Sequence, residues 1–499
     1  GTLTRRVFLP RGRRLAVCAW TLDAGSGTGW TLRVRPLFAY REAEALTRAN
    51  PDCNMALRDE EEGCAMTPYP GCPEFRLRHP GGRRRYDPLW YNGFRHALDA
   101  AAGRPSDEDF FTPCEIAYPL MPGATVYLAA GLEAGGAPAE IEARERTRRG
   151  EARPPTPEPA PLAALPARSA ESFVEEGRPG GARLILRRLG GEGGANREVW
   201  IALPGVLLHP RRTAEARALL AGALDRLARG GGVGDEALWF IRAAEQYVDH
   251  SRDWEFLRQA LAPACEALAQ RWIEGAPGVG YRLAPDGLLT SGGEGGLTWM
   301  DARDAGQAVT PRAGKPVEVN ALWHHALGLL ERWAARRNLP DKSRHYAALQ
   351  ELCGRSFRQR FWNAAEGCLY DVVDGPAGAP DGAIRPNQIW AVALPTDLLD
   401  RPQAAGTLAV VERRLMTPMG LRTLSIEDRA FAPSAAGGEF ARARHQGAVH
   451  PWLMGAYVDA VFRVHGRTAR GYARAEAALQ TLLTDHLREG AFGHVAECF

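Results

Sequence analysis

The stretch Leu297-Thr-Trp-Met-Asp301, which continues through Val309-Thr-Pro-Arg-Ala-Gly-Lys315 to Val317-Glu-Val-Asn-Ala-Leu-Trp323, decides how the whole chain is interpreted. Asp301 follows a tryptophan closely, and the second polar and aromatic run begins an amphipathic helix. The flanking glycines are Gly292, Gly293, Gly295 and Gly296. A carboxylic acid beside a tryptophan on a glycine-rich loop suits a pocket that stacks a hydroxylated ring. We therefore expect Asp301 to donate a proton to a sugar.

Length and composition indicate a soluble, globular protein with more than one domain. The chain has 499 residues, which exceeds one ordinary hydrophobic core, and 45% of them are hydrophobic. The net charge is only +3, and no basic stripe with interleaved aromatic residues is present, so we expect no nucleic-acid partner. No apolar run reaches the roughly 18 residues of a membrane span, so we expect no membrane partner.

The cysteines argue against a metal or disulfide framework. There are nine of them without a C-x-x-C pair, which argues against a zinc site and predicts reduced thiols in a cytoplasmic protein. Cys53, Cys64 and Cys72 lie close enough in sequence to leave a redox or metal role as an alternative, but we expect no metal or cofactor. The first residue is glycine, no signal-peptide pattern precedes it, and the sequence stops at Glu497-Cys-Phe499. From this we expect a fragment that is truncated at its C-terminus, and the sequence leaves the oligomeric state open.

Three regions of different character follow one another along the chain. Residues 1–130 contain short apolar segments, at 14–20, 30–38 and 125–130, separated by turn residues, which predicts an antiparallel β-sandwich. Residues 131–181 include a run rich in Pro, Ala and Arg, which predicts a linker. Residues 182–499 show a helical period.

The helical region predicts stacked helical hairpins. Thr213 begins the first helix as a capping residue, and Ser251 with Asp253 can cap the third. The irregular loops argue against a repeat solenoid and favour a closed toroid of paired helices. The expected helices span residues 213–229, 235–249, 252–274, 317–337, 341–361, 384–399, 403–416, 449–465 and 469–487.

Hydrolysis of an acetal requires a second carboxyl group besides Asp301. One group protonates the leaving oxygen and the other activates water or attacks carbon. The tryptophan and the glycine-rich loop are expected to raise the pKa of Asp301 towards the working pH. Glu318, at the start of a helix, and Glu497, after Gly493-His-Val-Ala, compete for the partner role. Asp301 can alternatively cap the next segment or pair with Arg303.

Aromatic and hydrogen-bonding side chains near loops could contact a sugar. His445 and Gln446 precede a helix that begins near Trp452, where they could either bind hydroxyl groups or cap that helix. Most tryptophans at helical spacing belong to a hydrophobic core, but several of these lie near Gly and Pro loops and could stack on a sugar. They are Trp239, Trp299, Trp323, Trp362, Trp390 and Trp452.

A series of ordered motifs resembles the amylo-α-1,6-glucosidase family of glycogen debranching enzymes. The order and the spacing of the motifs match as well as their residues, and the resemblance covers nearly the whole chain. The motifs are Arg197-Glu-Val-Trp-Ile-Ala-Leu-Pro-Gly205, Asp235-Glu-Ala-Leu-Trp-Phe-Ile241, Thr298-Trp-Met-Asp301, Thr310-Pro-Arg312, Pro316-Val-Glu-Val-Asn-Ala-Leu-Trp323, Arg385-Pro-Asn-Gln388, Gly420-Leu-Arg-Thr423 and His445-Gln-Gly-Ala-Val.

The resemblance implies a mainly α fold, with an (α/α)6 toroid behind an N-terminal antiparallel β-sandwich. It also implies inverting hydrolysis of the α-1,6-linked glucose left on debranched glycogen or a related α-glucan. On this basis Asp301 is the general acid, and Glu497 takes precedence over Glu318 as the general base. The expected substrate-binding residues are Arg197, Glu198, Asp235, Trp239, Trp299, Arg312, Glu318, His445, Gln446 and Trp452.

The chain departs from the family pattern in several places. The aromatic segment that ends in Trp-Gly-Arg-Asp is missing, and Gly194-Ala-Asn-Arg-Glu198 has Glu in the place of Asp. The loop before Asp235 is short, and His450 stands where a tryptophan is expected. These departures leave two alternatives to the glucosidase. One is a catalytically lapsed glucan-binding protein of the same fold, and the other is a toroid hydrolase acting on another α-glucoside such as trehalose.

Overall fold

The chain divides into two compact units in this computed structural model, Gly1–Pro159 with residues 436–438, and Ala160–Ala435 with Glu439–Phe499. The predicted domain boundaries at 130 and 181 remain a prediction. The structure describes residues 1–25, 27–42, 45–101, 105–133, 135–148, 169–176, 182–184, 197–228, 234–292, 296–304, 306–376, 378–432, 440–489 and 493–499.

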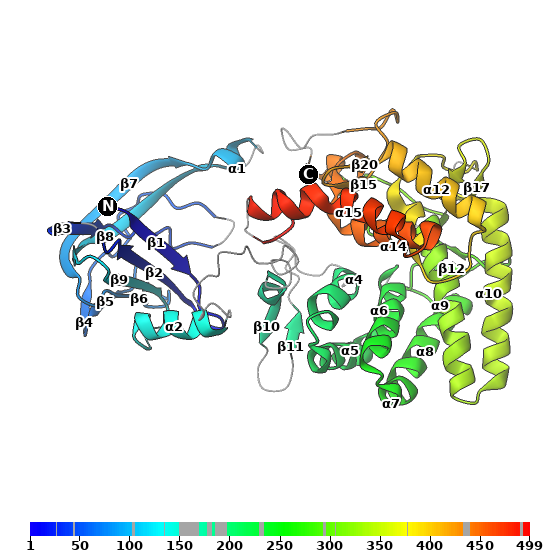
Figure 1. Cartoon of the computed structure of the whole chain (residues 1–499), viewed down its shortest axis with the longest axis horizontal. Helices are drawn as coiled ribbons and strands as arrows, with labels where there is room; N and C mark the ends of the chain where they lie inside the picture. Colours follow the sequence, from blue (N-terminus) through cyan, green and yellow to red (C-terminus); the bar gives the residue numbers. More distant parts are fainter. Residues whose placement is uncertain are drawn as a thin grey trace. The chain divides into compact units, whose positions relative to one another are not determined.

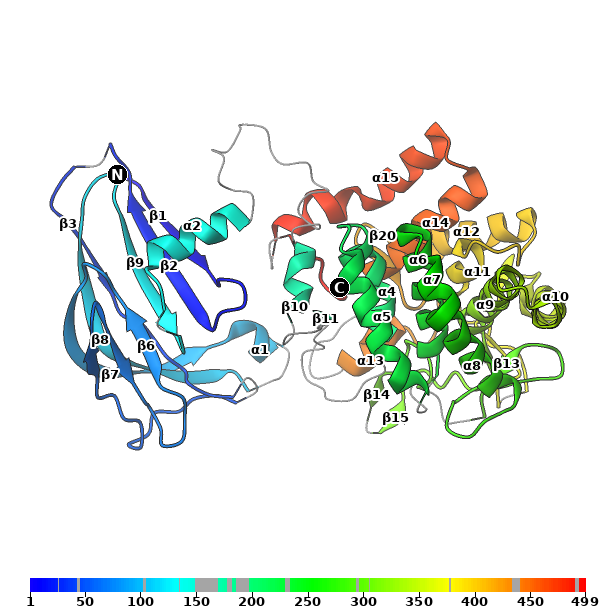
Figure 2. The same ribbon diagram turned by 90° about the horizontal axis from the view of Figure 1, so that it is seen from below.

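The N-terminal unit contains two antiparallel β-sheets (Figures 1 and 2). Its elements are β1 (Leu3–Phe8), β2 (Leu15–Leu22), β3 (Trp30–Val34), β4 (Arg58–Glu60), β5 (Gly63–Met66), β6 (Phe75–Arg78), β7 (Arg83–Arg95), α1 (Ala97–Ala101), β8 (Asp107–Leu120) and β9 (Thr125–Gly131). The larger sheet has the order β1-β2-β9-β6-β5-β4, and the smaller has the order β3-β8-β7. The predicted strand segments at 14–20, 30–38 and 125–130 coincide with β2, β3 and β9.

Side chains of both sheets share one hydrophobic core. Strand β2 is buried on both faces, since Cys18 and Trp20 pack in this core whereas Leu15 and Val17 pack in a second cluster with Ile141. The larger sheet contributes Trp20, Cys64, Leu77 and Leu128, and β8 contributes Cys114, Ile116 and Tyr118. The prediction of an antiparallel β region in this part of the chain is confirmed.

A helix, α2 (Pro138–Arg148), lies in the segment that was predicted to be a linker. Ile141 packs with the buried side chains of Leu15 and Val17. Glu142 accepts hydrogen bonds from Arg6 Nε and Tyr127 Oη, both at 2.7 Å. Helix α2 was not predicted, because it has too few apolar residues to show a clear helical period. The proline-rich run from 149 to 168 lies outside the described residues.

The second unit is mainly helical (Figure 1). The predicted helical ranges agree with the observed helices to within a few residues, except that 384–399 shortens to η4 and α11. The helices are η1 (Ala170–Phe173), α4 (Arg197–Leu203), η2 (Pro204–Leu208), α5 (Thr213–Ala228), α6 (Glu236–Ser251), α7 (Trp254–Phe256), η3 (Leu257–Leu261), α8 (Ala262–Ile273), α9 (Val317–Arg336), α10 (Pro340–Phe361), η4 (Pro386–Gln388), α11 (Ile389–Ala393), α12 (Arg401–Arg414), α13 (Phe440–Gln446), η6 (Pro451–Leu453), α14 (Met454–His465), α15 (Ala469–Thr484) and η7 (His486–Arg488).

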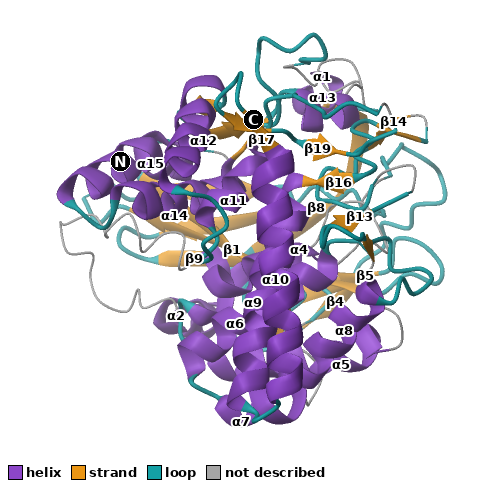
Figure 3. Cartoon of the chain, turned by 90° about the vertical axis from the view of Figure 1, so that its right-hand side faces the viewer, coloured by secondary structure: helices purple, strands orange, loops and turns teal. Residues whose placement is uncertain are grey.

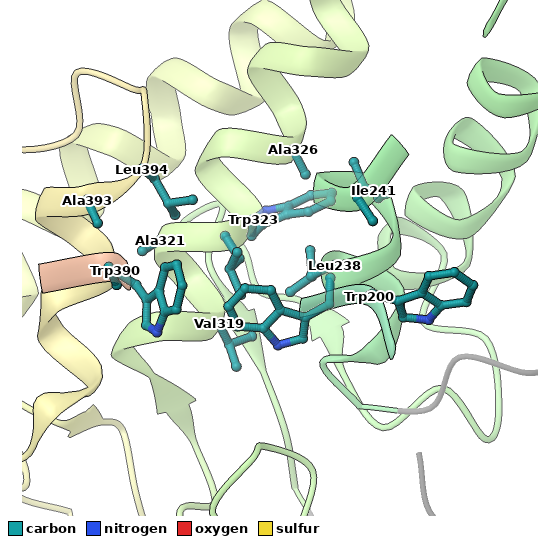
Figure 4. Close-up of a cluster of buried hydrophobic side chains, with 14 of the residues drawn as sticks. Trp200, Leu238, Ile241, Val319, Ala321, Trp323, Ala326, Trp390, Ala393 and Leu394 are labelled. Atoms are coloured by element: carbon teal, nitrogen blue, oxygen red, sulfur yellow. The ribbon is translucent and has the colours of Figure 1, made fainter. Parts of the chain in front are cut away.

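Helix α9 is buried on nearly every side, whereas α10 buries one face only. The two helices run side by side as a hairpin (Figures 1 and 3). Figure 4 shows Trp200, Trp323 and Trp390 among aliphatic side chains of α6, α9 and α11. This core fixes the ends of α6 and α9, and the loops that precede these helices carry the candidate site.

Short antiparallel strand pairs join the helices of the second unit. They are β10 (Val174–Glu176) with β11 (Ala182–Leu184), β12 (Arg282–Leu283) with β13 (Leu289–Thr290), β14 (Arg303–Asp304) with β15 (Gln307–Ala308), β16 (Lys315–Pro316) with β19 (Val372–Val373), β17 (Trp362–Asn363) with β18 (Cys368–Leu369), and β20 (Met416–Thr417), β21 (Gly420–Arg422) and β22 (Val449–His450). In the described part of the chain, no helix combines the length and the apolar character that crossing a membrane requires. All nine cysteines are free thiols.

Candidate active site

The loop that carries Asp301 is fixed at its base by a close backbone approach. Gly234 has φ +68°, and a Cβ atom there would lie 2.4 Å from the carbonyl oxygen of Leu297. That approach lets the amide of Asp235 donate to the Leu297 oxygen at 3.0 Å. Glycine is the residue that tolerates both this φ and this contact. Of the predicted flanking glycines, Gly293 and Gly295 lie outside the described residues.

The Thr298-to-Thr310 segment folds back on itself around Met300. Thr298 Oγ1 accepts a hydrogen bond from the Met300 amide at 3.2 Å, and Thr310 Oγ1 donates to the Met300 carbonyl at 2.9 Å. The amide of Val309 donates to the Ala302 carbonyl at 2.9 Å. These bonds fix the backbone on both sides of Asp301, whose side chain keeps 22% of its surface exposed.

Arg197 connects Asp301 to a second carboxylate. Its Nη1 donates to Oδ2 of Asp301 and its Nε donates to Oδ1 of Asp235, both at 2.7 Å. Asp235 is fully buried, and its Oδ2 accepts from Trp239 Nε1 at 3.1 Å. Burial lowers the pKa of Arg197, but the two carboxylates outweigh it and raise that pKa above its ordinary value. Arg197 is therefore a permanent cation behind Asp301.

Glu198 lies beside the same guanidinium but faces outward. Its Oε1 is 3.9 Å from Arg197 Nη1, and half of its side chain is exposed. Burial of its carboxyl group raises the pKa of Glu198, and Arg197 opposes that rise. The carboxyl group of Glu198 thus provides a polar group near Asp301. The residues just before Arg197 lie outside the described part of the chain.

A second buried arginine, Arg312, has all its donors occupied. Its Nε donates to Asp371 Oδ2 at 2.6 Å, and Nη2 donates to Glu318 Oε2 at 2.6 Å and to Asp371 Oδ1 at 2.9 Å. Nη1 donates to Glu318 Oε1 and, at 3.2 Å, to Thr298 Oγ1. A guanidinium has five N–H groups. Glu318, which has no exposed surface, therefore serves as a counterion of Arg312.

Asn387 joins this network to Trp299. Its Oδ1 accepts from Trp299 Nε1 at 2.8 Å, and its Nδ2 donates to Asp371 Oδ1 at 2.8 Å. The same nitrogen lies 3.5 Å from the sulfur of Met300. Asn387 belongs to the Arg385-Pro-Asn-Gln motif, for which no individual role was predicted. Asp371 lies in none of the predicted motifs.

Four of the six predicted tryptophans come together. Trp452 lies 5.1 Å from Trp299 and 5.9 Å from Trp390 between ring centroids, and Trp239 lies 4.8 Å from Trp390. Trp323 packs instead on Trp272, and its Nε1 donates to the Gly287 carbonyl. Trp362 lies beside Gly406. Trp452 is the half-buried member of the four, and the other three are buried.

The His445-Gln446 motif lies against Trp299. The ring centroid of His445 is 5.4 Å from that of Trp299, and both its ring nitrogens are buried without a hydrogen-bond partner among the described residues. Burial lowers the pKa of His445 to about 2, so the imidazole is neutral. Gln446 accepts from Arg385 Nη2 at 2.8 Å and donates to the Val309 carbonyl at 3.3 Å. Its amide thus ties α13 to the loop after Asp301.

The segment that carries Glu497 pairs with β22 through backbone hydrogen bonds. The backbone groups of Phe499 and Val449 exchange hydrogen bonds of 2.8 and 2.9 Å. Glu497 pairs with Arg444 and keeps 60% of its side chain exposed. Burial lowers the pKa of His450 to about 4, and the charge of Glu497 works against that shift. His450, the residue after Val449, lies 5.4 Å from Trp299 between ring centroids.

The two predicted catalytic carboxyl groups both keep exposed surface. Asp301 follows Trp299 by two positions and binds Arg197, whereas Glu497 pairs with Arg444. Among the described residues, no cluster of three His, Cys, Asp or Glu side chains could hold a metal ion. The available chemistry is proton transfer at oxygen, with aromatic faces and a buried guanidinium to orient a polar ligand.

Two family models match this chain. Residues 194–499 match the model described as amylo-alpha-1,6-glucosidase, and residues 1–127 match the model described as glycogen debranching enzyme N terminal. In a comparison with curated proteins, no sequence matches. The first match covers the helices and loops that contribute Arg197, Asp301 and Glu497.

Proposed function

The chain belongs to the amylo-alpha-1,6-glucosidase family, and we propose that it is a glycosidase that removes α-1,6-linked glucose from debranched glycogen or a related α-glucan. The observation that carries the proposal is the contact between Arg197 and Asp301. It anchors a partly exposed carboxyl group beside Trp299, within the part of the chain that matches the family.

The proposed reaction uses Asp301 as the general acid and Glu497 as the general base. Asp301 gives its proton to the glycosidic oxygen as the bond to the anomeric carbon breaks. Glu497 removes a proton from a water molecule that attacks that carbon from the opposite face, so the configuration inverts. An inverting pair is separated by ~6.5–9.5 Å, which leaves room for the water molecule.

The residues proposed to touch the glucose are two with exposed surface in this part of the chain, together with Arg197, whose buried guanidinium binds Asp301. Glu198 and Trp452 keep exposed surface, and Arg197 presents its guanidinium to Asp301. The glucose ring would stack on Trp452, with its hydroxyl groups bound by the charged groups. The buried Asp235, Trp239 and His445 and the half-buried Gln446 would hold these groups in place from behind.

The proposed scaffold is an (α/α)6 toroid in which α9 is an inner helix and α10 an outer one. The deep burial of α9 and the single buried face of α10 support this arrangement. We also propose a β-sandwich for the N-terminal unit, a cytoplasmic location and activity without a cofactor. The core shared by the two sheets supports the first of these.

The test is the release of free glucose from a 6-O-α-glucosyl maltooligosaccharide. The wild-type chain should release glucose, and Asp301→Asn should slow the release by about 10²–10⁴-fold, the usual contribution of a general acid. Trehalose and maltose serve as comparison substrates. Retention on glycogen without release of glucose would favour a glucan-binding protein, and cleavage of trehalose alone would indicate another α-glucosidase.

A further inference from the structure

The side chain of Asn387 makes the one connection, among the described residues, between the indole nitrogen of Trp299 and the buried charges behind it. We propose that Asn387, supported by Asp371 and Arg312, is a positioning residue for the general acid. In this role it fixes Trp299 and Met300 so that Asp301 meets the glycosidic oxygen. The inference rests on the proposed function of Asp301.

The side-chain amide of Asn387 bridges Trp299 and Asp371. Its oxygen accepts from Trp299 Nε1 and its nitrogen donates to Asp371 Oδ1, each at 2.8 Å, and all three residues are buried. The nitrogen also contacts the sulfur of Met300. Both residues directly before Asp301 are therefore held by one side chain from η4, 88 positions along the chain from Trp299.

The group behind Asn387 is held together by several charged hydrogen bonds. Arg312 binds Asp371 through two side-chain oxygens and binds Glu318 through two more. The Asp371 carbonyl accepts from the Val317 amide at 2.9 Å, at the start of α9. Because all five N–H groups of Arg312 are occupied, it has no free donor for a sugar hydroxyl. Arg312 and Glu318 thus belong to the support and not to the sugar-binding surface.

This support would act on catalysis through the position of the Asp301 carboxyl group. Asp301 itself is bonded by Arg197 through Oδ2, and among the described residues no side chain binds Oδ1. The position of the free oxygen then depends on the backbone that Trp299 and Met300 define. A displacement of about 1 Å can cost about 10²-fold in rate, so a support that removes this freedom has a catalytic effect.

The test compares two substrates that differ in their need for an acid. A 6-O-α-glucosyl maltooligosaccharide needs a proton on its leaving oxygen, whereas α-glucosyl fluoride loses fluoride as an anion. Asn387→Leu, which keeps the size but removes both hydrogen bonds, should lower kcat on the oligosaccharide by about 10²-fold with little change in KM. The same variant should retain most of its activity on the fluoride.

Two further variants keep the test decisive. Trp299→Phe removes the other partner of the same hydrogen bond and should separate the two substrates in the same direction if Asn387→Leu does not fold. Asn320→Leu is the matched control, since Asn320 is another fully buried asparagine, which bonds the backbone of Leu289 and not Trp299. It should change both activities by the same factor.

The outcomes distinguish the two proposals. Parallel losses on both substrates in Asn387→Leu and Trp299→Phe, or no loss at all, would overturn the positioning role while leaving the glucosidase intact. A wild-type chain that releases glucose from neither substrate would overturn the proposed function itself.

Discussion

Nη1 of Arg197 lies 2.7 Å from Oδ2 of Asp301, and this guanidinium is shared with a carboxylate that has no exposed surface. The pairing places one buried cation between a sealed carboxylate, Asp235, and one that solvent reaches. Loss of the cation therefore has two separate consequences. It leaves a buried negative charge uncompensated, and it frees the proposed general acid.

Replacing Arg197 with Met tests the first consequence. Among the described residues, only Trp239 would then still bind the Asp235 carboxylate, so the free energy of unfolding should fall by about 3–5 kcal/mol, as for other broken buried ion pairs. Urea titration of the two proteins measures the change. In the double variant Arg197→Met/Asp235→Leu the buried charge is gone, and much of the stability should return. Equal stability of wild type and Arg197→Met would show that Asp235 does not need the arginine.

Glu497→Gln tests the proposed base with both substrates. Activation of water is needed whatever group leaves, so hydrolysis of the oligosaccharide and of α-glucosyl fluoride should both slow by about 10²–10⁴-fold. Asp301→Asn should slow the oligosaccharide only. Steady-state kinetics separate the two patterns. Glu489→Gln, an exposed carboxylate in the same part of the chain, serves as the control and should resemble wild type.

Gly234→Ala tests the close approach at the base of the Asp301 loop. The new methyl group would meet the Leu297 carbonyl in a backbone conformation that disfavours a side chain, so we expect a loss of stability of about 1–3 kcal/mol. Gly222→Ala on α5 has open space around it and should instead stabilise the protein by about 0.5–1 kcal/mol. Thermal unfolding of both variants checks the contrast. A stable Gly234→Ala would mean that the loop can shift freely.

Buried histidines predict how stability depends on pH. Burial lowers the pKa of His324 to about 4 from its ordinary value of 6.5, so the unfolded chain binds more protons between these values. The contribution of neutral His324 to the free energy of unfolding is complete above pH 6.5 and is lost as the pH falls towards 4. Between pH 7.5 and pH 5 the loss should be about 2 kcal/mol.

The histidine prediction is checked by urea titration of wild type and His324→Gln at both pH values. The variant should lose about 2 kcal/mol less on acidification, because glutamine does not titrate. The same loss in both proteins would mean that His324 is not buried in its neutral form.

Much of the helical unit follows from local pattern. Helices α5 and α9 begin within a residue of their predicted starts, because a sustained apolar period and a first-turn acid define them. The third predicted helix is capped by Asp253, which accepts from the Phe256 amide at 3.0 Å, whereas Ser251, the expected cap, is the last residue of α6. Helix α2 was missed because its few apolar residues carry no strong period.

The sequence motifs predicted which residues belong to the site, but not how these residues contact one another. Local sequence placed Asp301 beside Trp299, but the bond of Trp299 to Asn387 spans 88 positions and leaves no periodic signal. Likewise, no sequence pattern indicates that the N–H groups of Arg312 donate hydrogen bonds to Asp371 and Glu318. These hydrogen-bond partners come together only when loops that are distant in sequence pack against one another. Which side chains support the site, and which face a ligand, therefore cannot be predicted from local sequence.

The anomeric form of the first glucose released tests the central claim most directly. Proton NMR spectra recorded during the first minutes of hydrolysis of a 6-O-α-glucosyl maltooligosaccharide distinguish the two anomers before they interconvert. A general acid at Asp301 and a general base at Glu497 predict β-glucose as the first product. Release of α-glucose would contradict the account, because it would require one carboxylate to attack the anomeric carbon.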